Sequence, residues 1–538
     1  MTQLTSSYWP ATADIALIDS TCGSALRAAA VADPDKLALI DGHADRARRR
    51  RWTYAELLAE AERTARALLD CFQPGEHVAI WAGNCPQWVI LQYAIALAGL
   101  VMVTVNPACR SAELTYVLRQ SRARGVFHQT DYRGLDMGAT VRAAVASEAH
   151  AVATVVCLDA LAEFVAMHDR GAALPAVAPA DPCMIQYTSG TTGRPKGALL
   201  NHYSVTNNAR IMVLIKGLDA GAINLAVAPL FHTAGCVGNV LGMTQIGGTM
   251  VLPASFDAES MLDLIEQEQV TYTFGVPTML IALLAAQARQ PRCLASLTIV
   301  FSGATIVPME VVRQVEQQFG VTLIIGYGQT ETSPAITHTR PHDNTQDKSE
   351  TIGQPIPQIE VKIIDPTTGA IVPVGQSGEL CTRGFLVMMG YYDMPEATAA
   401  TIDGDGWLHT GDLCAMDARG FFRITGRLKD MIIRGGENIY PREVEELLYT
   451  HAAVAEVAVI GIPDDYWGEQ VAAVITMKAG ALVSGAALRE FLAPQLARHK
   501  LPSLWYAVNA IPATASGKLQ KFRLVEMYRA GELEAARI

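Results

Sequence analysis

The residues best suited to chemistry lie at positions 187–197, in a loop with the sequence YTSGTTGRPKG. Glycines let backbone N–H groups approach phosphate oxygens, the Ser and Thr hydroxyls add hydrogen-bond donors, and Lys196 adds a positive charge. The loop is not a Walker P-loop, because Lys196 is followed by Gly197 rather than by Ser or Thr. We therefore expect a polyphosphate site here, and the alternative is a flexible surface turn.

Further segments place polar side chains directly after a predicted strand or a tight turn. GYGQTET at 326–332 and SGAT at 302–305 each follow a buried strand, and GWLHTGD at 406–412 ends on a carboxylate. Ligands of open α/β sheets bind at the carboxyl ends of strands, so the first two segments are expected at one edge. Each segment alone is also typical of an ordinary glycine turn.

Together these segments resemble the motifs of the adenylate-forming superfamily, which includes acyl-CoA synthetases, beetle luciferases and the adenylation domains of nonribosomal peptide synthetases. Six further segments match in the family's order after the first loop, between Pro229 and Lys518, and the 538 residues are about the length of a stand-alone member. The branch that the chain resembles is that of acyl-CoA synthetases, or fatty-acid–CoA ligases. The resemblance implies ATP, Mg²⁺ and coenzyme A as cofactor and co-substrates.

The resemblance also implies roles for single residues in nucleotide binding. Tyr327 would stack on adenine, Thr330 would bond the α-phosphate, Glu331 would hold Mg²⁺ as its metal ligand, and Asp412 would accept hydrogen bonds from both ribose hydroxyls. The ATP-binding residues carried over in this way are Thr188, Ser189, Gly190, Thr191, Thr192, Lys196, Ser302, Gly303, Ala304, Gly326, Tyr327, Gly328, Gln329, Thr330, Asp412, Arg427 and Lys518.

The remaining motifs imply an acyl pocket, a hinge and a coenzyme A site. PLFHTAG at 229–235 matches the segment in which an aromatic residue or His gates the carboxylate pocket. The acyl-pocket residues are His232, Gly235, Val237 and Gly238. Lys429 would be the hinge, Gly435 and Gly436 would admit the pantetheine arm, and Lys518 would reach the reacting carboxylate. The catalytic residues implied are Lys518, Thr188, Glu331 and His232.

The composition excludes several classes of protein. The net charge of −11 disfavours nucleic acid binding, and charged residues make up only 18%, against about a quarter in an average protein. We expect the arginine-rich run at 46–51 to be a solvated hairpin tip. The ten cysteines include no CxxC pair, so they suggest neither a metal site nor a disulfide framework. The N-terminus lacks a secretory pattern. We therefore expect a cytoplasmic location. The sequence leaves a monomer or a homodimer open.

The pattern of apolar runs predicts the fold class. Short runs at 78–81, 154–158, 297–301 and 322–325 alternate with helical patterns, which indicates parallel α/β sheets. The uncharged stretch at 88–105 is expected to be a buried helix and strand rather than a membrane span. The pattern also places a β-rich subdomain before a boundary near 427–430. The resemblance implies a luciferase-like adenylating fold: an N-terminal adenylation domain at 1–426, a hinge at 427–430, and a small mobile α+β domain at 431–538 that carries the catalytic lysine.

The predicted reaction is ATP-dependent formation of an acyl-adenylate with release of pyrophosphate, followed by transfer to coenzyme A. No carboxylate occurs between Ala220 and Phe256 to pair with a substrate amine, which favours an uncharged acyl group. The sequence resembles medium-chain fatty acyl-CoA synthetases, which implies a medium-chain fatty acid. Aryl, branched and polycyclic acids fit the same description. Transfer to a carrier-protein thiol, luciferase-like oxygenation, and a non-catalytic nucleotide-binding partner or regulator remain as alternatives.

Overall fold

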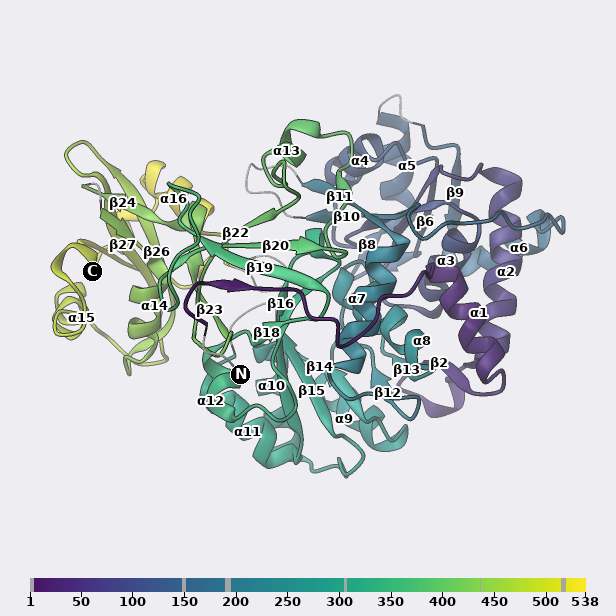
Figure 1. The fold of residues 1–538 in the computed structure, drawn as a ribbon, viewed down its shortest axis with the longest axis horizontal. Helices are drawn as coiled ribbons and strands as arrows, with labels where there is room; N and C mark the ends of the chain where they lie inside the picture. Colours follow the sequence, from purple (N-terminus) through teal and green to yellow (C-terminus); the bar gives the residue numbers. More distant parts are fainter. Residues whose placement is uncertain (1–3, 148–150, 189–194, 304–306, 436, 514–518) are drawn as a thin grey trace. The chain divides into compact units, whose positions relative to one another are not determined.

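The computed structural model describes residues 4–147, 151–188, 195–303, 307–435, 437–513 and 519–538 (Figure 1). The chain divides into two compact units. The larger unit comprises Trp9–Val361 and Thr382–His409, and the smaller comprises Met1–Tyr8, Lys362–Cys381 and Thr410–Ile538.

A seven-stranded sheet of the larger unit carries the glycine- and hydroxyl-rich loop. Its order is β21 (Gly390–Tyr391), β11 (Lys196–Asn201), β10 (Pro182–Thr188), β5 (Val101–Val105), β4 (His77–Trp81), β6 (Gly125–His128) and β9 (Thr154–Cys157). Strands β10 to β9 in this order are parallel, whereas β11 pairs antiparallel with both of its neighbours. The strands predicted at 78–81 and 154–158 are therefore confirmed.

A nine-stranded sheet carries the other predicted nucleotide segments. Its order is β18 (Gln354–Pro355), β17 (Ala335–His338), β16 (Thr322–Gly328), β15 (Ile299–Gly303), β14 (Tyr272–Phe274), β12 (Ile223–Leu225), β13 (Thr249–Leu252), β2 (Leu37–Asp41) and β3 (Arg51–Thr53). The six strands from β16 to β2 run parallel, and the edges are antiparallel. A parallel α/β layout is thus confirmed.

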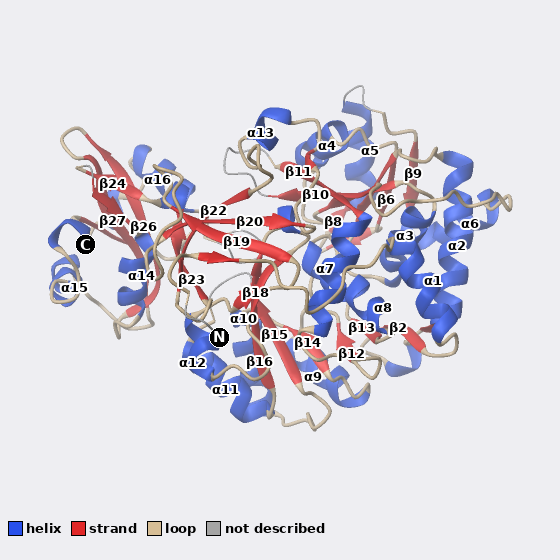
Figure 2. Ribbon diagram, viewed as in Figure 1, coloured by secondary structure: helices blue, strands red, loops and turns tan. Residues whose placement is uncertain are grey.

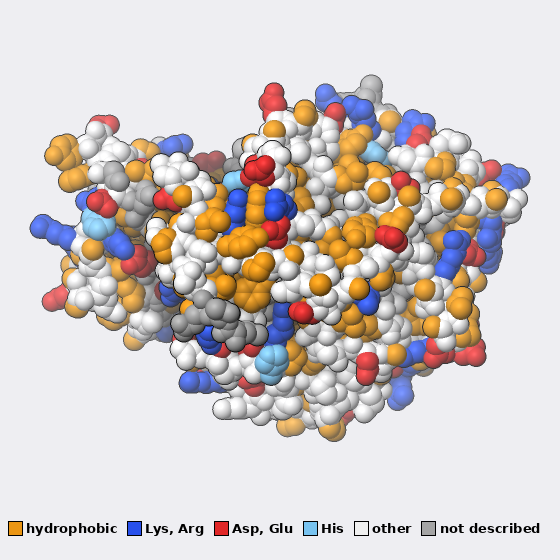
Figure 3. Space-filling model, viewed as in Figure 1, with side chains coloured by type: hydrophobic (Ala, Val, Ile, Leu, Met, Phe, Trp, Pro, Cys, Tyr) orange, Lys and Arg blue, Asp and Glu red, His pale blue; other side chains and the backbone are white. Residues whose placement is uncertain are grey.

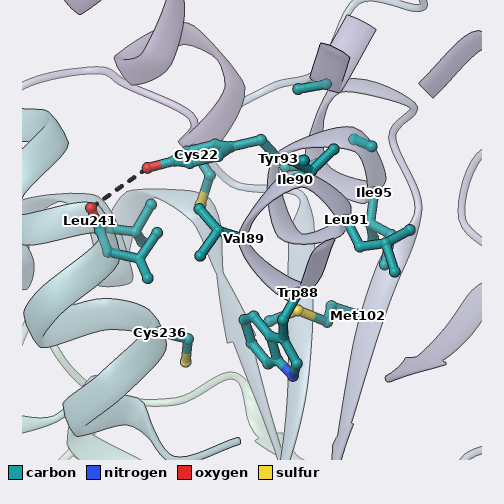
Figure 4. Close-up of a cluster of buried hydrophobic side chains, with 14 of the residues drawn as sticks. Cys22, Trp88, Val89, Ile90, Leu91, Tyr93, Ile95, Met102, Cys236 and Leu241 are labelled. Atoms are coloured by element: carbon teal, nitrogen blue, oxygen red, sulfur yellow. Dashed lines mark hydrogen bonds between the residues drawn. The ribbon is translucent and has the colours of Figure 1, made fainter. Parts of the chain in front are cut away.

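Helices flank both sheets (Figure 2). They are α1 (Cys22–Ala32), α2 (Tyr54–Cys71), α3 (Pro86–Leu97), α4 (Ser111–Gln120), α5 (Met137–Ser147), α6 (Leu161–His168), α7 (His202–Leu214), α8 (Gly242–Ile246), α9 (Ala258–Gln267), α10 (Pro277–Arg289), α11 (Met309–Phe319), α12 (Thr345–Glu350) and α13 (Pro395–Ala399), with the π-helix η3 (Ala234–Leu241) and a two-stranded ribbon of β7 (Asp131–Tyr132) and β8 (Leu135–Asp136). One core cluster gathers residues of α1, α3, α7 and η3, and Figure 4 shows Trp88 beside Met102 in that cluster.

The stretch at 88–105 follows the expectation of a buried helix and strand. It forms most of α3 and all of β5, and nearly every side chain in it is buried in protein. Within the described residues we find no helix with the length and apolar character that a bilayer crossing requires.

The smaller unit contains most of the remaining strands. One sheet has the order β1 (Tyr8–Trp9), β19 (Ile359–Ile364), β20 (Gly378–Gly384), β22 (Leu408–Met416) and β23 (Phe422–Arg427), and the chain passes between the units along β19, β20 and β22. The second sheet is formed by β25 (Glu437–Ile439), β24 (Ile432–Arg434), β27 (Gly468–Met477), β26 (Val454–Asp464) and β28 (Leu504–Ala507), with helices α14 (Pro441–Tyr449), α15 (Gly485–Leu492) and α16 (Lys521–Arg529). The hinge predicted at 427–430 lies inside this unit and stays a prediction.

The arginine-rich run needs a correction. Strands β2 and β3 form the expected antiparallel hairpin, but Arg49 is buried, and its Nη1 lies 2.7 Å from Oε1 of Glu268. Arg51 also pairs with Glu268, at 2.9 Å. A solvated tip was the wrong prediction for Arg49, because a distant carboxylate compensates its burial. Elsewhere, basic and acidic side chains are interspersed on the face shown in Figure 3.

Candidate active site

The predicted phosphate loop connects two paired strands. Thr188 ends β10 and Lys196 begins β11, and the two residues lie opposite each other in the antiparallel ladder. The Thr188 hydroxyl donates to the Lys196 carbonyl at 3.4 Å, and the Tyr116 hydroxyl donates to the Pro195 carbonyl at 2.8 Å. The loop residues predicted to contact ATP, Ser189, Gly190, Thr191 and Thr192, lie outside the described residues. The structure therefore positions both ends of the loop.

Tyr391 connects the predicted phosphate lysine to the predicted magnesium ligand. The ammonium of Lys196 lies 4.8 Å from the centre of the Tyr391 ring. The Tyr391 hydroxyl donates a hydrogen bond of 2.8 Å to Oε1 of Glu331. Burial, together with the Glu331 charge, raises the pKa of Tyr391, so its phenol stays protonated and remains a donor. Sequence reasoning missed Tyr391, because GYYD at 390–393 carries no sign of chemistry.

Glu331 is suited to the Mg²⁺ that the resemblance implies. It lies in the 3₁₀ turn η4 (Thr330–Thr332), half-buried, and its backbone carbonyl accepts from the Met388 amide at 2.9 Å. Tyr391 occupies Oε1, while no contact among the described residues takes Oε2. A fixed carboxylate with one oxygen available fits a hard cation such as Mg²⁺.

The two segments predicted to surround adenine are neighbours. Gly303 at the end of β15 pairs with Gly326 on β16, so both segments lie at the carboxyl edge of the sheet, as predicted. Glycine is needed at 303 for this approach, because a Cβ there would lie 2.6 Å from the Gly326 carbonyl oxygen. Glycine is needed at 328 for another contact, since a Cβ there would lie 1.8 Å from the Pro334 carbonyl oxygen. Ala304 lies outside the described residues.

Side chains at this edge are oriented by local hydrogen bonds. The Thr332 hydroxyl accepts from the Gln329 amide at 3.0 Å, which fixes the turn that carries Thr330. Tyr327 is half-buried, as a ring that stacks on a ligand requires, and its role as the adenine contact stays a prediction. The Ser302 hydroxyl is buried and has no hydrogen-bond partner among the described residues.

The predicted acyl-pocket residues lie around the start of η3. Burial lowers the pKa of His232 to about 4, so its ring is neutral near pH 7. The centres of the His232 and Phe231 rings are 4.3 Å apart. A Cβ on Gly235 would meet the Pro229 carbonyl oxygen at 2.2 Å, so this glycine closes the turn. Val237 belongs to the main core, and Gly238 faces Met212 of α7. Their contact with an acyl group stays a prediction.

The predicted ribose ligand lies in the smaller unit. Asp412 is buried on β22, opposite Arg427 of β23, and Arg427 Nε lies 3.2 Å from Asp412 Oδ1. Thr410 donates from its hydroxyl to the Leu380 carbonyl at 2.7 Å and accepts from the Asp412 amide at 3.1 Å. The sequence predicted both charged residues for the nucleotide, but not that they pair with each other.

The predicted hinge and coenzyme A residues belong to the same unit. Lys429 is in the 3₁₀ turn η5 (Leu428–Asp430), and burial lowers its pKa, against the opposing effect of the Asp430 charge. Gly435 has φ +60°, and a Cβ there would lie 2.8 Å from the Trp467 ring, so only glycine fits. Gly436 and Lys518 lie outside the described residues, and the roles of all four stay predictions.

Comparison with known families decides the identity of the chain. The AMP-binding enzyme family matches residues 26–392, and the AMP-binding enzyme C-terminal domain matches residues 443–518. The chain belongs to the AMP-binding enzyme family. The predicted membership of the adenylate-forming superfamily is thereby confirmed.

Relatives along nearly the whole chain are acyl-CoA synthetases. The putative acyl-CoA synthetase YngI of Bacillus subtilis (strain 168) is 39% identical over 538 residues, covering 95% of this chain and 97% of the relative. The mitochondrial medium-chain acyl-CoA ligase ACSF2 of Rattus norvegicus is 33% identical, covering 97% and 89%. ATP-bound MatB from Rhodopseudomonas palustris has a TM-score of 0.85 at 29% identity, covering 95% and 99%.

These matches confirm the predicted fold and reaction class. This AMP-binding enzyme has the luciferase-like adenylating fold and is an AMP-forming acid–CoA ligase that uses ATP and coenzyme A. It forms an acyl-adenylate and transfers the acyl group to coenzyme A. Mg²⁺ is the metal that the family uses with ATP.

Proposed function

We propose that this ligase activates acids with a largely apolar acyl group, of which medium-chain fatty acids are the type. The observation that carries the proposal is the segment from Ala220 to Phe256, which contains no Asp, Glu, Lys or Arg. His232, the one histidine in it, is uncharged at neutral pH because burial lowers its pKa to about 4. An acyl group placed against this segment meets apolar surface, which favours an apolar chain.

In the first half-reaction, an oxygen of the substrate carboxylate attacks the α-phosphorus of ATP and pyrophosphate leaves. Negative charge on the phosphate oxygens then needs donors and cations that are already in position. Thr188 and Lys196 would supply these at the two ends of the loop, and the Tyr391 hydroxyl would keep the hydrogen-bonded Glu331 carboxylate in position. Mg²⁺ held by Glu331 would shield the phosphates.

In the second half-reaction, the thiolate of coenzyme A attacks the acyl carbonyl and AMP leaves. We infer that the domain at 431–538 reorients about Lys429 between the two steps, withdraws Lys518 and presents Gly435 and Gly436 to the pantetheine arm. We further infer a cytoplasmic location. Light scattering can decide whether the protein is a monomer or a homodimer. The adenylation domain at 1–426 and the mobile domain at 431–538 remain part of this proposal.

The test is a measurement of pyrophosphate release with ATP and Mg²⁺ over aliphatic, aromatic and polycyclic acids, each with and without coenzyme A. Medium-chain aliphatic acids are expected to give the highest kcat/KM, with acyl-CoA detected by mass spectrometry. Preference for aromatic or polycyclic acids would contradict the proposed substrate class. Release without thioester would instead identify a carrier-protein acceptor.

A further inference from the structure

Lys216 is a buried lysine that has no counter-ion among the described residues. It follows α7, is 2% exposed, and forms no ion pair or hydrogen bond among the described residues. Its ammonium lies 4.3 Å from the centre of the Phe301 ring and 5.5 Å from that of Tyr272. Lysines are almost never fully buried unless they are paired, so this position requires an explanation.

Lys348 shows how the chain treats a buried lysine that serves the fold. It is 4% exposed, and its ammonium contacts Oε1 of Glu316 at 2.9 Å. These are the two buried lysines among the described residues, and only Lys216 lacks a carboxylate. Aromatic faces attract a cation, but they replace its hydration only in part. We therefore consider a bound ligand as the partner that Lys216 lacks among the described residues.

Polar groups near Lys216 also lack hydrogen-bond partners in the part of the chain that the structure describes. Asn224 on β12 is fully buried, and both its amide nitrogen and its amide oxygen lack hydrogen bonds among the described residues. Asn224 pairs in register with Tyr272 on β14, so both side chains project from the same face of the sheet. His338 Nδ1 is likewise unpartnered, and its ring stacks on Phe301 at 4.9 Å with an interplanar angle of 9°. Unpaired buried donors and acceptors are costly unless a ligand or water uses them.

Two observations connect Lys216 to the predicted substrate site. Phe301, whose ring lies beneath the ammonium, directly precedes Ser302 and Gly303 of the predicted nucleotide segment. On α7, Met212 lies one turn before Lys216 and reaches within 3.6 Å of a Cβ built on Gly238, a predicted acyl-pocket residue. Burial lowers the pKa of Lys216 to about 7, because desolvation disfavours the charged ammonium.

We propose that Lys216, assisted by Asn224, binds a second carboxylate at the end of the acyl chain remote from the carboxyl group that is activated. The preferred substrates are then α,ω-dicarboxylic acids with an apolar middle. A carboxylate supplies a negative counter-charge for the Lys216 ammonium. It also accepts a hydrogen bond from the side-chain amide of Asn224. This inference rests on the proposed function and deepens it, since the same site receives the apolar part of the chain.

The test compares matched acids that differ only in the distal group: octanoate with suberate, and decanoate with sebacate. Pyrophosphate release is measured for the wild type, Lys216→Met, Lys216→Arg and the control Lys348→Met. The wild type is expected to prefer each diacid. Lys216→Met should lower kcat/KM for the diacids by about 10- to 100-fold, the loss of a hydrogen bond to a charged group, while sparing the monoacids. Lys216→Arg should retain part of the preference, and Lys348→Met should keep the wild-type ratio.

Equal diacid-to-monoacid ratios in the wild type and Lys216→Met would overturn the inference. So would release from other acids without any release from the diacids. If Lys216→Met does not fold, Asn224→Asp replaces it: a carboxylate beside the ammonium should abolish the diacid preference, and an unchanged preference would contradict the proposal. Failure of every acid of the wider panel would count against the proposed function instead, so the two failures are distinguishable.

Discussion

At the scale of single residues, Tyr391 is the contact that motifs do not reveal. It is 60 residues from Glu331 in sequence, and its hydroxyl fixes one carboxylate oxygen while its ring lies against Lys196. A tyrosine in this position performs two tasks that can be separated by substitution, because phenylalanine keeps the ring and removes only the donor.

We predict that Tyr391→Phe slows adenylation by about 10- to 100-fold, because a hydrogen bond to a charged group is lost and Glu331 is no longer held in place. Pyrophosphate release at a series of Mg²⁺ concentrations measures the effect, which should include a higher Mg²⁺ requirement. Tyr392→Phe is the matched control, since this neighbouring ring packs edge-on against His77. Equal behaviour of the two variants would contradict a role for the Tyr391 hydroxyl.

His232 gives a second prediction at this scale. Because burial lowers its pKa to about 4, the ring carries no charge at neutral pH and cannot serve as a cation there. His232→Phe should therefore keep the shape of the pH profile of adenylation between about pH 5 and 8, although KM for the acid changes. Loss of an ionisation near pH 6 in His232→Phe would show that the histidine titrates during the reaction.

At the scale of elements, the hairpin of β2 and β3 depends on a carboxylate from elsewhere in the chain. Glu268 follows α9 and pairs with Arg49, whose side chain is 1% exposed, and with Arg51. Removing one partner of a buried pair leaves an uncompensated charge, which costs more than the pair contributes.

Glu268→Gln should lower the free energy of unfolding of the larger unit by about 3 kcal/mol. The matched control is Glu60→Gln, which removes the partner of the exposed Arg50 and should cost at most about 1 kcal/mol. Urea denaturation followed by tryptophan fluorescence provides the measurement, and Trp52 on β3 lies within the hairpin. Similar urea midpoints for the two variants would mean that the ion pair of Arg49 with Glu268 does not stabilise the hairpin.

Local patterns predicted many elements, and non-local contacts account for what they missed. The run Val101–Val105 became β5 because β-branched residues with no charge suit a buried parallel strand. The Thr53–Glu56 capping box, a local pattern, starts α2. By contrast, Cys22, Cys183 and His202 come from separate elements, and their ligand atoms lie within 4.8 Å of one another. The spacing of these residues in the sequence does not predict the cluster. It does not predict the contacts of Tyr391 or Lys216 either.

At the scale of the whole molecule, we predict that Lys518 acts in adenylation and not in thioester formation. Measuring the two half-reactions separately tests this prediction. Lys518 lies outside the described residues, and its assignment comes from the PATASGK segment at 512–518. Lys518→Ala should impair formation of the acyl-adenylate and spare thioester formation from a supplied acyl-adenylate, because only the first step needs a cation at the α-phosphate. Equal loss in both steps would contradict the assignment, and Lys521→Ala, three residues away on α16, is the control.

Lys216 also makes the stability of the whole chain depend on pH. Its folded pKa of about 7 is below its ordinary value of 10.5, so between these values the unfolded chain binds the proton that the folded chain releases. Stability from this group therefore rises with pH across that window, by at most about 1.4 kcal/mol per pH unit, and the penalty of the buried charge is complete below pH 7. The facing titratable groups are His338 on β17 and Tyr272 on β14; burial lowers the pKa of His338 and raises that of Tyr272, so both are neutral throughout.

The free energy of unfolding of Lys216→Met should consequently exceed that of the wild type most at pH 7 and least near pH 9.5, measured by urea denaturation at both values. Lys348→Met should be less stable than the wild type at both, because Glu316 loses its partner. A saturating diacid should raise the pKa of the bound lysine by adding the missing charge, and the wild type should then gain more stability at pH 7 than at pH 9.5. If the free energies of unfolding of Lys216→Met and the wild type differ by the same amount at both pH values, Lys216 keeps one protonation state between them. Binding of a diacid would then not change the protonation of Lys216.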